Sequence, residues 1–130
     1  MISSSSGAPP PKPLILVVDD EIDITETYAM LFELHDFEVM TAGNGSEALA
    51  KIMLQTPDII VSDCMMPMMG GVEMCERVRN MSSHGDIPII LCSGAPELHK
   101  LSHSRHDLFL KKPVMFETLL TEVKRLLQRK

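Results

Sequence analysis

Short, mainly apolar runs recur along the chain and are separated by longer amphipathic stretches. The runs are LILVV (14–18), FEVMT (37–41), DIIVS (58–62), IPIIL (87–91) and LFL (108–110). Short continuous apolar runs are typical of strands that are buried on both faces of a sheet. We therefore expect one strand from each run.

The stretches between the runs place apolar residues at helical spacing. Their apolar positions are Ile24, Tyr28, Leu31 and Leu34; Ala48, Leu49, Ile52 and Met53; Val72, Cys75 and Val78; and Phe116, Leu119, Leu120, Val123, Leu126 and Leu127. Asn44 or Ser46 can cap the second of these helices, and Pro57 ends it. Gly70 and Gly71 open the third. A short His-rich segment after the fourth run provides the remaining helix.

Strands that alternate with helices predict an α/β fold: a doubly wound, five-stranded parallel sheet flanked by five helices. Residues 13–130 form this domain. Residues 1–12 are rich in Ser and Pro, which cannot pack a core, so we expect a disordered tail. In such sheets, ligands bind beyond the carboxyl ends of the strands.

Composition narrows the classes of function. The 130 residues carry a formal net charge of -6, which argues against direct binding of nucleic acid. No apolar run approaches the length of a membrane span. The three cysteines show no C-x-x-C spacing and fit a reducing compartment, so we expect a cytoplasmic protein.

Strongly polar side chains follow four of the predicted strands. They are Asp19 and Asp20 after the first run, Asp63 after the third, Ser93 after the fourth, and Lys111 and Lys112 after the fifth. Carboxylates gathered at one edge repel each other unless a hard cation such as Mg²⁺ compensates them. A metal alone needs neither a lysine nor a hydroxyl. The whole set fits a phosphoryl group carried on one aspartate, with the carboxylate as nucleophile.

The chain resembles the receiver domains of two-component response regulators, the group that includes the bacterial chemotaxis regulator. The matching stretches are LILVVDDE, GNGSEAL, PDIIVSDCMMPMMGG, IPIILCSGA and FLKKP, in this order between residues 14 and 128. The resemblance implies a flavodoxin-like receiver fold. It implies that Asp63 is the phosphoacceptor, that Asp20 holds Mg²⁺ directly and Asp19 largely through water, and that Met65 contributes its backbone carbonyl.

The resemblance also implies the residues of a conformational switch. Lys112, immediately before Pro113, takes the role of the family's lysine, and Lys111 lies on the surface. Ser93 is the switch hydroxyl, and Phe109 stands where the family keeps an aromatic switch residue.

The implied function is to accept a phosphoryl group from a sensor histidine kinase or phosphotransfer protein and to relay a conformational change. A homodimer is possible in such proteins. We expect no turnover of an external substrate and only slow loss of the phosphoryl group, because Met65 and Ala95 cannot orient the attacking water. Two alternatives are a pseudo-receiver that only binds proteins and a Mg²⁺-dependent phosphatase with an aspartate nucleophile. The phosphatases usually carry D-x-D, which SDCMMP lacks.

Two further patterns have simpler interpretations. GNGSEA (43–48) fits the dinucleotide-binding fingerprint, but a turn followed by a helix cap explains it as well. His99, His103 and His106 have the spacing of metal ligands on a helix, although a solvated helix face is the simpler interpretation. The segment 93–112 is shorter than in the family and SRH replaces its usual Ala-Gly-Ala, so we expect a short or irregular fourth helix.

Overall fold

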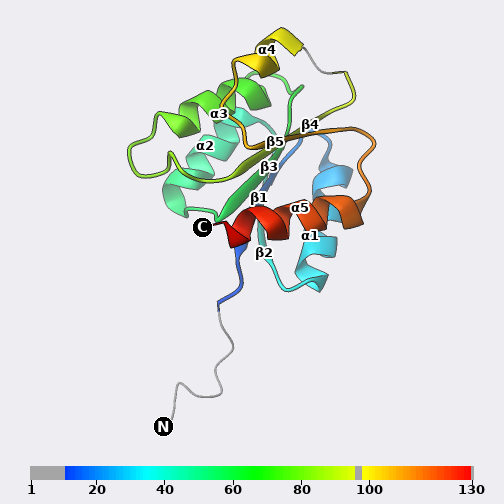
Figure 1. The fold of residues 1–130 in the computed structure, drawn as a ribbon. Helices are drawn as coiled ribbons and strands as arrows, with labels where there is room; N and C mark the ends of the chain where they lie inside the picture. Colours follow the sequence, from blue (N-terminus) through cyan, green and yellow to red (C-terminus); the bar gives the residue numbers. More distant parts are fainter. Residues whose placement is uncertain (1–10, 96–97, 130) are drawn as a thin grey trace.

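A single parallel sheet with helices on both faces forms the fold (Figure 1). The computed structural model describes residues 11–95 and 98–129. The strands are β1 (Leu14–Val18), β2 (Glu38–Ala42), β3 (Ile59–Asp63), β4 (Ile89–Ser93) and β5 (Leu108–Lys111). They are arranged in the order β2-β1-β3-β4-β5, and every neighbouring pair is parallel. The predicted fold class is confirmed.

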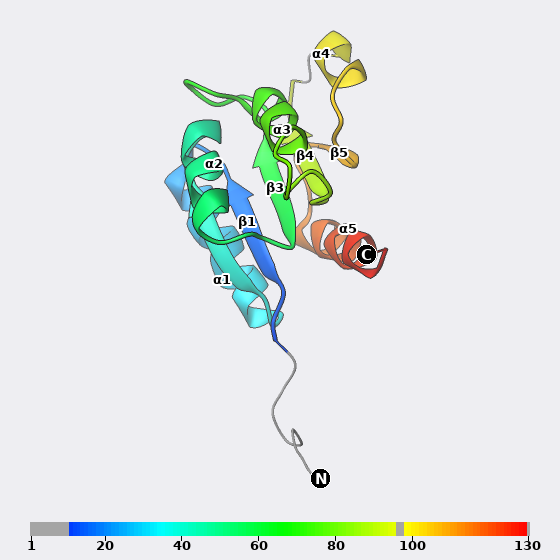
Figure 2. The ribbon, with the colours of Figure 1, turned by 90° about the vertical axis from the view of Figure 1, so that its left-hand side faces the viewer.

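The helices cover the sheet in two layers (Figure 1 and Figure 2). They are α1 (Ile22–Leu34), α2 (Gly45–Leu54), α3 (Gly71–Arg79), α4 (Leu98–Ser102) and α5 (Phe116–Gln128). α1 and α5 pack on one face, and α2 and α3 pack on the other. Each helix runs back antiparallel to the strands, so the carboxyl ends of all the strands lie at the same edge of the sheet.

The core is divided by the sheet into two clusters, because successive side chains of a strand point to opposite faces. In β1, Leu16 and Val18 face α2 and α3, whereas Ile15 and Val17 face α1 and α5. All four side chains are buried, as expected for a central strand.

Three strands begin later than the apolar runs that predict them: β2 and β3 by one residue and β4 by two. β4 begins at Ile89, where its pairing with Ile60 starts. Ile87 and Pro88 are buried as well, but proline has no backbone N–H, and the Pro88 carbonyl only accepts a hydrogen bond from Ile60 N. The prediction of strand 87–91 was therefore wrong by two residues, although its buried character is confirmed.

The sequence GNGSEA forms a turn and a helix cap. The Asn44 side chain accepts a hydrogen bond from Glu47 N at 2.9 Å, and the Glu47 carboxylate accepts one from Gly43 N at 2.7 Å. The Glu47 carboxylate thus reaches one residue further back than in a capping box, where it would accept from the N-cap N–H. Asn44 rather than Ser46 is therefore the cap.

The fourth helix is short, as predicted. It ends at Ser102, so His103 and His106 lie beyond it. The three histidines therefore do not share a helix face, and the prediction of a solvated His-bearing helix face was wrong. Burial lowers the pKa of His106. No cluster of potential metal ligands found within the described residues includes a histidine.

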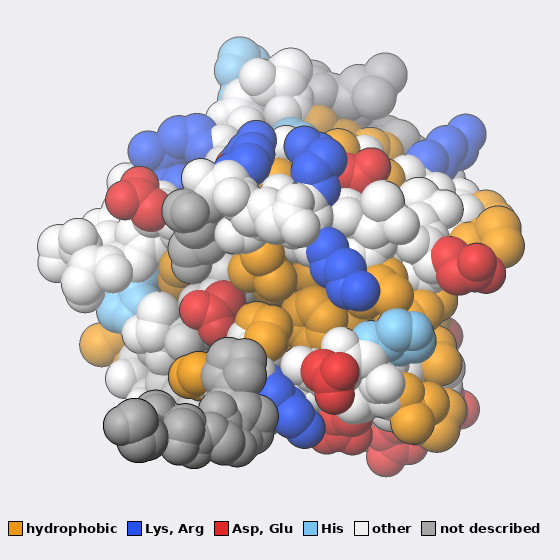
Figure 3. All heavy atoms as spheres, turned by 60° about the horizontal axis from the view of Figure 1, so that its bottom comes forward, with side chains coloured by type: hydrophobic (Ala, Val, Ile, Leu, Met, Phe, Trp, Pro, Cys, Tyr) orange, Lys and Arg blue, Asp and Glu red, His pale blue; other side chains and the backbone are white. Residues whose placement is uncertain are grey.

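Two expectations concern the whole chain. No helix in the described ranges has the length and apolar character needed to cross a membrane. On the face shown in Figure 3, a central group of apolar side chains is surrounded by side chains of both charges.

The predicted tail, residues 1–12, lies mostly outside the described residues, so its disorder stays a prediction.

Candidate functional site

Three carboxylates gather at the carboxyl edge of the sheet. Asp19 follows β1, Asp20 comes next, and Asp63 ends β3. One carboxylate oxygen of each lies within 4.8 Å of the others. Asp19 is buried, Asp63 is partly buried and Asp20 is exposed, so the cluster opens to solvent on the side of Asp20.

Lys112 lies against two of these carboxylates. Its Nζ is 3.3 Å from Asp19 Oδ2 and 3.4 Å from Asp63 Oδ1. Burial alone would lower the pKa of Lys112, but the attraction of Asp63 and Asp19 outweighs it and raises the pKa. The lysine is therefore held in its charged form between the ends of β1 and β3.

The acceptor predicted by the sequence, Asp63, is poorly solvated. Burial raises the pKa of Asp63, Lys112 opposes this rise, and the charge of Asp19 adds to it. Three carboxylates beside one ammonium leave an excess of negative charge. Oxygen ligands with this excess fit a divalent cation such as Mg²⁺.

Short backbone contacts fix the loop that follows Asp63. A side chain at Gly71 would place its Cβ only 2.4 Å from the Asp63 carbonyl oxygen, so this position requires glycine. Gly71 N donates to the Cys64 carbonyl at 3.0 Å. At the far end of the loop, the Met69 carbonyl accepts a hydrogen bond from Gly45 N at 2.8 Å. The loop is thus tied to both α3 and α2.

Ser93 lies next to this site along the sheet. Asp63 pairs with Cys92 in the register of β3 and β4, so Ser93 is one residue beyond that pair. Its side chain is buried, its Oγ accepts from Ala95 N at 3.2 Å, and its carbonyl accepts from Lys112 N at 3.0 Å. The structure therefore brings Ser93 close to the lysine along the backbone.

Cys92, which pairs with Asp63 in the sheet, is not a reactive thiol. Burial, above all, raises the pKa of its thiol to about 12, so the thiol stays neutral.

Phe109 is half-buried in β5 and packs against the core beneath α2 and α3. Its side chain therefore faces away from the α1 side.

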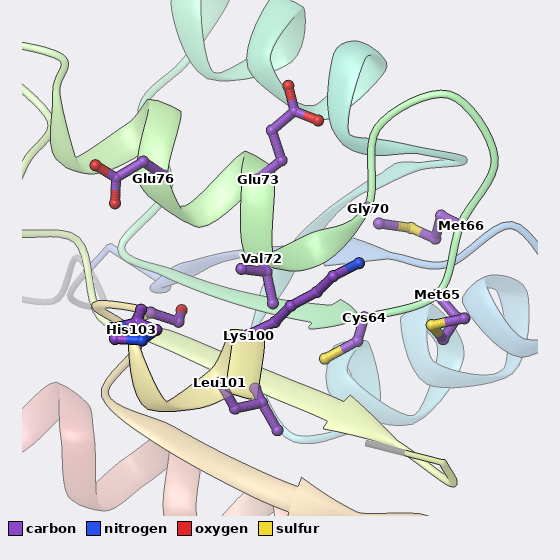
Figure 4. Close-up of a pocket in the computed structure, with 11 residues that line it drawn as sticks. Cys64, Met65, Met66, Gly70, Val72, Glu73, Glu76, Lys100, Leu101 and His103 are labelled. Atoms are coloured by element: carbon purple, nitrogen blue, oxygen red, sulfur yellow. The ribbon is translucent and has the colours of Figure 1, made fainter. Parts of the chain in front are cut away.

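A hollow lies between α3 and α4, next to the loop that follows Asp63 (Figure 4). It has a volume of about 660 Å³ and includes Met65, whose side chain is 55% exposed. The Lys100 side chain extends across it from α4 (Figure 4). Its amino group points toward the loop that carries Met65 and Met66, while Glu73 points away. The hollow therefore connects the loop after Asp63 with α4.

Tyr28 is a site residue that the sequence pattern did not reveal. It lines a small cavity together with Asp19, Asp63 and Lys112. Its spacing marks it only as one of several apolar positions on a helix. Its neighbours come from β1, β3 and the end of β5, so only the folded structure shows this contact.

Comparison with known proteins agrees with this geometry. A profile of the family described as "Response regulator receiver domain" matches residues 15–124. The chain is 34% identical to the protein PilG of Pseudomonas aeruginosa over 113 residues, which cover 85% of this chain and 84% of PilG. It is 36% identical over 122 residues to the hybrid signal transduction histidine kinase D of Dictyostelium discoideum, covering 92% of this chain but 8% of that protein.

Solved structures show the same fold. The signal receiver domain of a histidine kinase from Syntrophus aciditrophicus superposes with a TM-score of 0.85 at 29% identity, covering 89% of this chain and 90% of that one. The chemotaxis response regulator CheY4 of Vibrio cholerae gives 0.81 at 34% identity, covering 88% and 98%. The acidic edge with its lysine, the fold and the family match agree, and the chain belongs to the family of response regulator receiver domains.

Proposed function

We propose that this receiver domain accepts a phosphoryl group on Asp63 in the presence of Mg²⁺. The observation that carries the proposal is the position of Lys112, whose ammonium lies between Asp19 and Asp63. A cation bridging two carboxylates can move toward the oxygens of an incoming phosphoryl group without leaving the site. Such neutralisation by positioned cations is the main requirement of phosphoryl transfer.

The proposed phosphoryl transfer uses the side chains at the carboxyl edge of the sheet. An ionised oxygen of Asp63 attacks phosphorus, the new O–P bond forms, and the P–N bond to a donor histidine breaks. Lys112 stabilises the negative charge on the transferring oxygens. Asp19, Asp20, Asp63 and the Met65 carbonyl would hold Mg²⁺, which supplies further neutralisation. The nitrogen of the donor leaves with the electron pair of the broken bond.

A sensor histidine kinase or a phosphotransfer protein is the proposed donor. Exposed apolar side chains lie on the segments that follow β1, β3 and β5: Ile22, Met65, Met68 and Met115, with exposures of 71%, 55%, 81% and 68%. Apolar side chains around a polar centre are typical of protein interaction sites. This distribution supports a macromolecular donor.

The proposed output is a conformational change that starts at Ser93 and Phe109. Ser93 lies beside the Lys112 backbone, and Phe109 packs with Leu101 against the same core cluster. A shift of Ser93 toward a phosphoryl oxygen would therefore alter the packing around α4.

The acceptor is tested by incubation with Mg²⁺ and acetyl phosphate, followed by intact-mass measurement. The wild-type protein should gain the mass of one phosphoryl group, which is stable in acid and labile in base. Asp63→Asn should gain none. Asp86→Asn, which changes an exposed aspartate near the opposite edge, should behave like wild type. Gain by Asp63→Asn would assign the acceptor elsewhere, and no gain by wild type would favour a pseudo-receiver.

The metal site is tested by thermal unfolding. Mg²⁺ should raise the Tm of the wild-type protein, because a ligand that binds only the folded state stabilises it. Asp20→Ala should remove this rise, since Asp20 is the exposed member of the cluster. An undiminished rise in Asp20→Ala would place the metal outside this cluster.

A further inference from the structure

Tyr28 separates the acidic site from a hollow beside α1. It lines the cavity of about 20 Å³ that contains Asp19, Asp63 and Lys112. It also lines a hollow of about 580 Å³ that includes Ile24 and Thr27 of α1. The residues that border both spaces are Tyr28, Lys112 and Val114. The tyrosine therefore forms part of the wall along which the lysine side chain runs.

The ring of Tyr28 is held by other aromatic rings. Its centroid lies 6.3 Å from that of Phe32 and 6.4 Å from that of Phe116. Phe32 is fully buried, and it contacts Phe116 edge-on at 4.9 Å. Ring contacts at these distances are favourable, and a tyrosine has few torsions to restrict. The Tyr28 ring is thus held in place by aromatic side chains of both α1 and α5.

The Lys112 side chain needs packing contacts that hold its ammonium group in place. A lysine carries its charge on a flexible four-carbon chain, and this side chain is 29% exposed. Its contacts with Asp19 and Asp63, at 3.3 Å and 3.4 Å, are long for hydrogen bonds. Toward β4 the neighbour is Gly94, which has no side chain: a Cβ there would lie 3.8 Å from Lys112 Cβ.

We propose that Tyr28 is a positioning residue whose ring, anchored by Phe32 and Phe116, keeps the Lys112 ammonium between Asp19 and Asp63. The effect on phosphorylation rests on the proposed function, whereas the effect on the lysine side chain does not. Burial, with smaller effects of nearby groups, raises the pKa of Tyr28, so its hydroxyl remains neutral beside the charged site.

Three variants separate positioning from simple core packing. Tyr28→Leu removes the ring from the wall, and Tyr28→Phe keeps the ring without the hydroxyl. Phe37→Leu is the matched control, because it removes a ring that contacts Phe32 and borders neither space. The measurements are unfolding in urea, NMR relaxation of the Lys112 Cε group, and the rate of phosphorylation by acetyl phosphate with Mg²⁺.

Tyr28→Leu should increase the mobility of Lys112 Cε and slow phosphorylation by about tenfold or more, because small misplacements of a catalytic group have large effects. Tyr28→Phe should restore both properties to near wild type. Phe37→Leu should lower stability, because Phe37 is buried, and change neither property. If Tyr28→Leu does not fold, Tyr28→Met replaces it under the same criteria.

Unchanged mobility of Lys112 Cε in Tyr28→Leu would overturn the inference, as would equal effects of Phe37→Leu on mobility and rate. Failure of the wild-type protein to take up phosphate would overturn the proposed function instead. The NMR measurement on unphosphorylated protein would still decide the role of Tyr28.

Discussion

At the scale of single residues, the acidic site combines groups whose charges are costly in the absence of a metal. Asp63 is partly buried and close to Asp19, and only Lys112 compensates the pair among the contacts that the described residues make there. Such an arrangement stores unfavourable electrostatic energy that a cation or a covalent modification can relieve. The site is therefore built for binding at the expense of stability.

The raised pKa of Asp63 has a defined effect on stability. The folded state holds this proton more tightly than the unfolded chain, so the stabilisation is present below the ordinary value of 3.8 and is lost as pH rises through the higher folded-state pKa. Asp63→Asn should therefore stabilise the metal-free protein more at pH 7 than at pH 4, as measured by urea unfolding. A larger gain at pH 4 would contradict the sign of the shift.

The lifetime of the phosphorylated state should depend on Met65 and Ala95. Both residues are exposed, and neither side chain carries a group that can orient water. We expect a phosphorylated state that lasts many minutes to hours. Met65→Asn combined with Ala95→Glu should shorten it about tenfold, or about 1.4 kcal/mol in barrier, in a radiolabel decay assay. Decay of the wild type within seconds, or an unchanged lifetime in the double variant, would show that water is positioned by other groups.

Most residues of the site could be named from the sequence because they stand at strand ends, where a parallel sheet brings its carboxyl termini together. Asp19, Asp63 and Lys112 meet for this reason. The roles of Ser93, Phe109 and Met65 stay predictions. Tyr28 could not be found in this way, because its position depends on how α1 packs against α5 rather than on any pattern along the chain.

At the scale of elements, the start of α2 shows how a helix boundary is fixed. The Asn44 side chain satisfies a backbone N–H group of the first helical turn, and the Glu47 carboxylate accepts from Gly43 N in the turn before the helix. The same turn positions Gly45, which contacts the loop after Asp63 through Met69. The cap therefore supports the acceptor loop as well as the helix.

Loss of this cap should be measurable. Asn44→Ala should lower the free energy of unfolding by about 1 kcal/mol, because a backbone N–H of the first turn loses its partner. Ser46→Ala, two residues away at an exposed position, should change it by less than about 0.5 kcal/mol. Chemical denaturation of the two variants under identical conditions provides the comparison. Equal effects would mean that Ser46 contributes to the cap.

Element boundaries were harder to predict than element types. β2 begins at Glu38 rather than Phe37, because Glu38 pairs with Leu14 while the Phe37 ring packs against Phe32. Pairing between strands determines where a strand begins, and a single run of sequence does not contain its partner's register. The buried face of α5 follows the hydrophobic pattern as predicted, with Leu119, Val123 and Leu126 buried. The predicted faces of α1 and α2 were wrong in part, because Leu34 and Met53 are exposed and Phe32 is buried.

At the scale of the whole molecule, a charged network joins segments at the edge opposite the acidic site. The Arg79 guanidinium lies 2.8 Å from Asp107 Oδ2 and also donates to backbone carbonyls of Gly85, Ile87 and Arg105. Asp107 in turn accepts from Ile89 N and contacts Arg129 at 3.3 Å. No sequence pattern indicates this network, because its members are far apart along the chain.

Arg79→Gln should destabilise the protein by at least about 2 kcal/mol, because three backbone carbonyls lose their charged donor and Asp107 loses its nearer cation. Only 10% of the Arg79 side chain is exposed. Arg77→Gln is the control, since Arg77 is 58% exposed and pairs only with Glu73 on the helix surface, worth less than about 0.5 kcal/mol. Urea unfolding should separate the two, and similar losses would show that the network adds little.

The positions of Pro13 and Arg129 determine where a label can be attached without covering the acidic site. Pro13, whose carbonyl accepts from Glu38 N, and Arg129, at the end of α5, both lie at the edge of the sheet away from Asp63 (Figure 1). A fluorescent label or an affinity tag attached beside Pro13 or Arg129 would therefore lie at the edge of the sheet opposite Asp63. Immobilised through such a tag, the molecule would present the edge that carries Asp63 to the solution, where a partner can reach it.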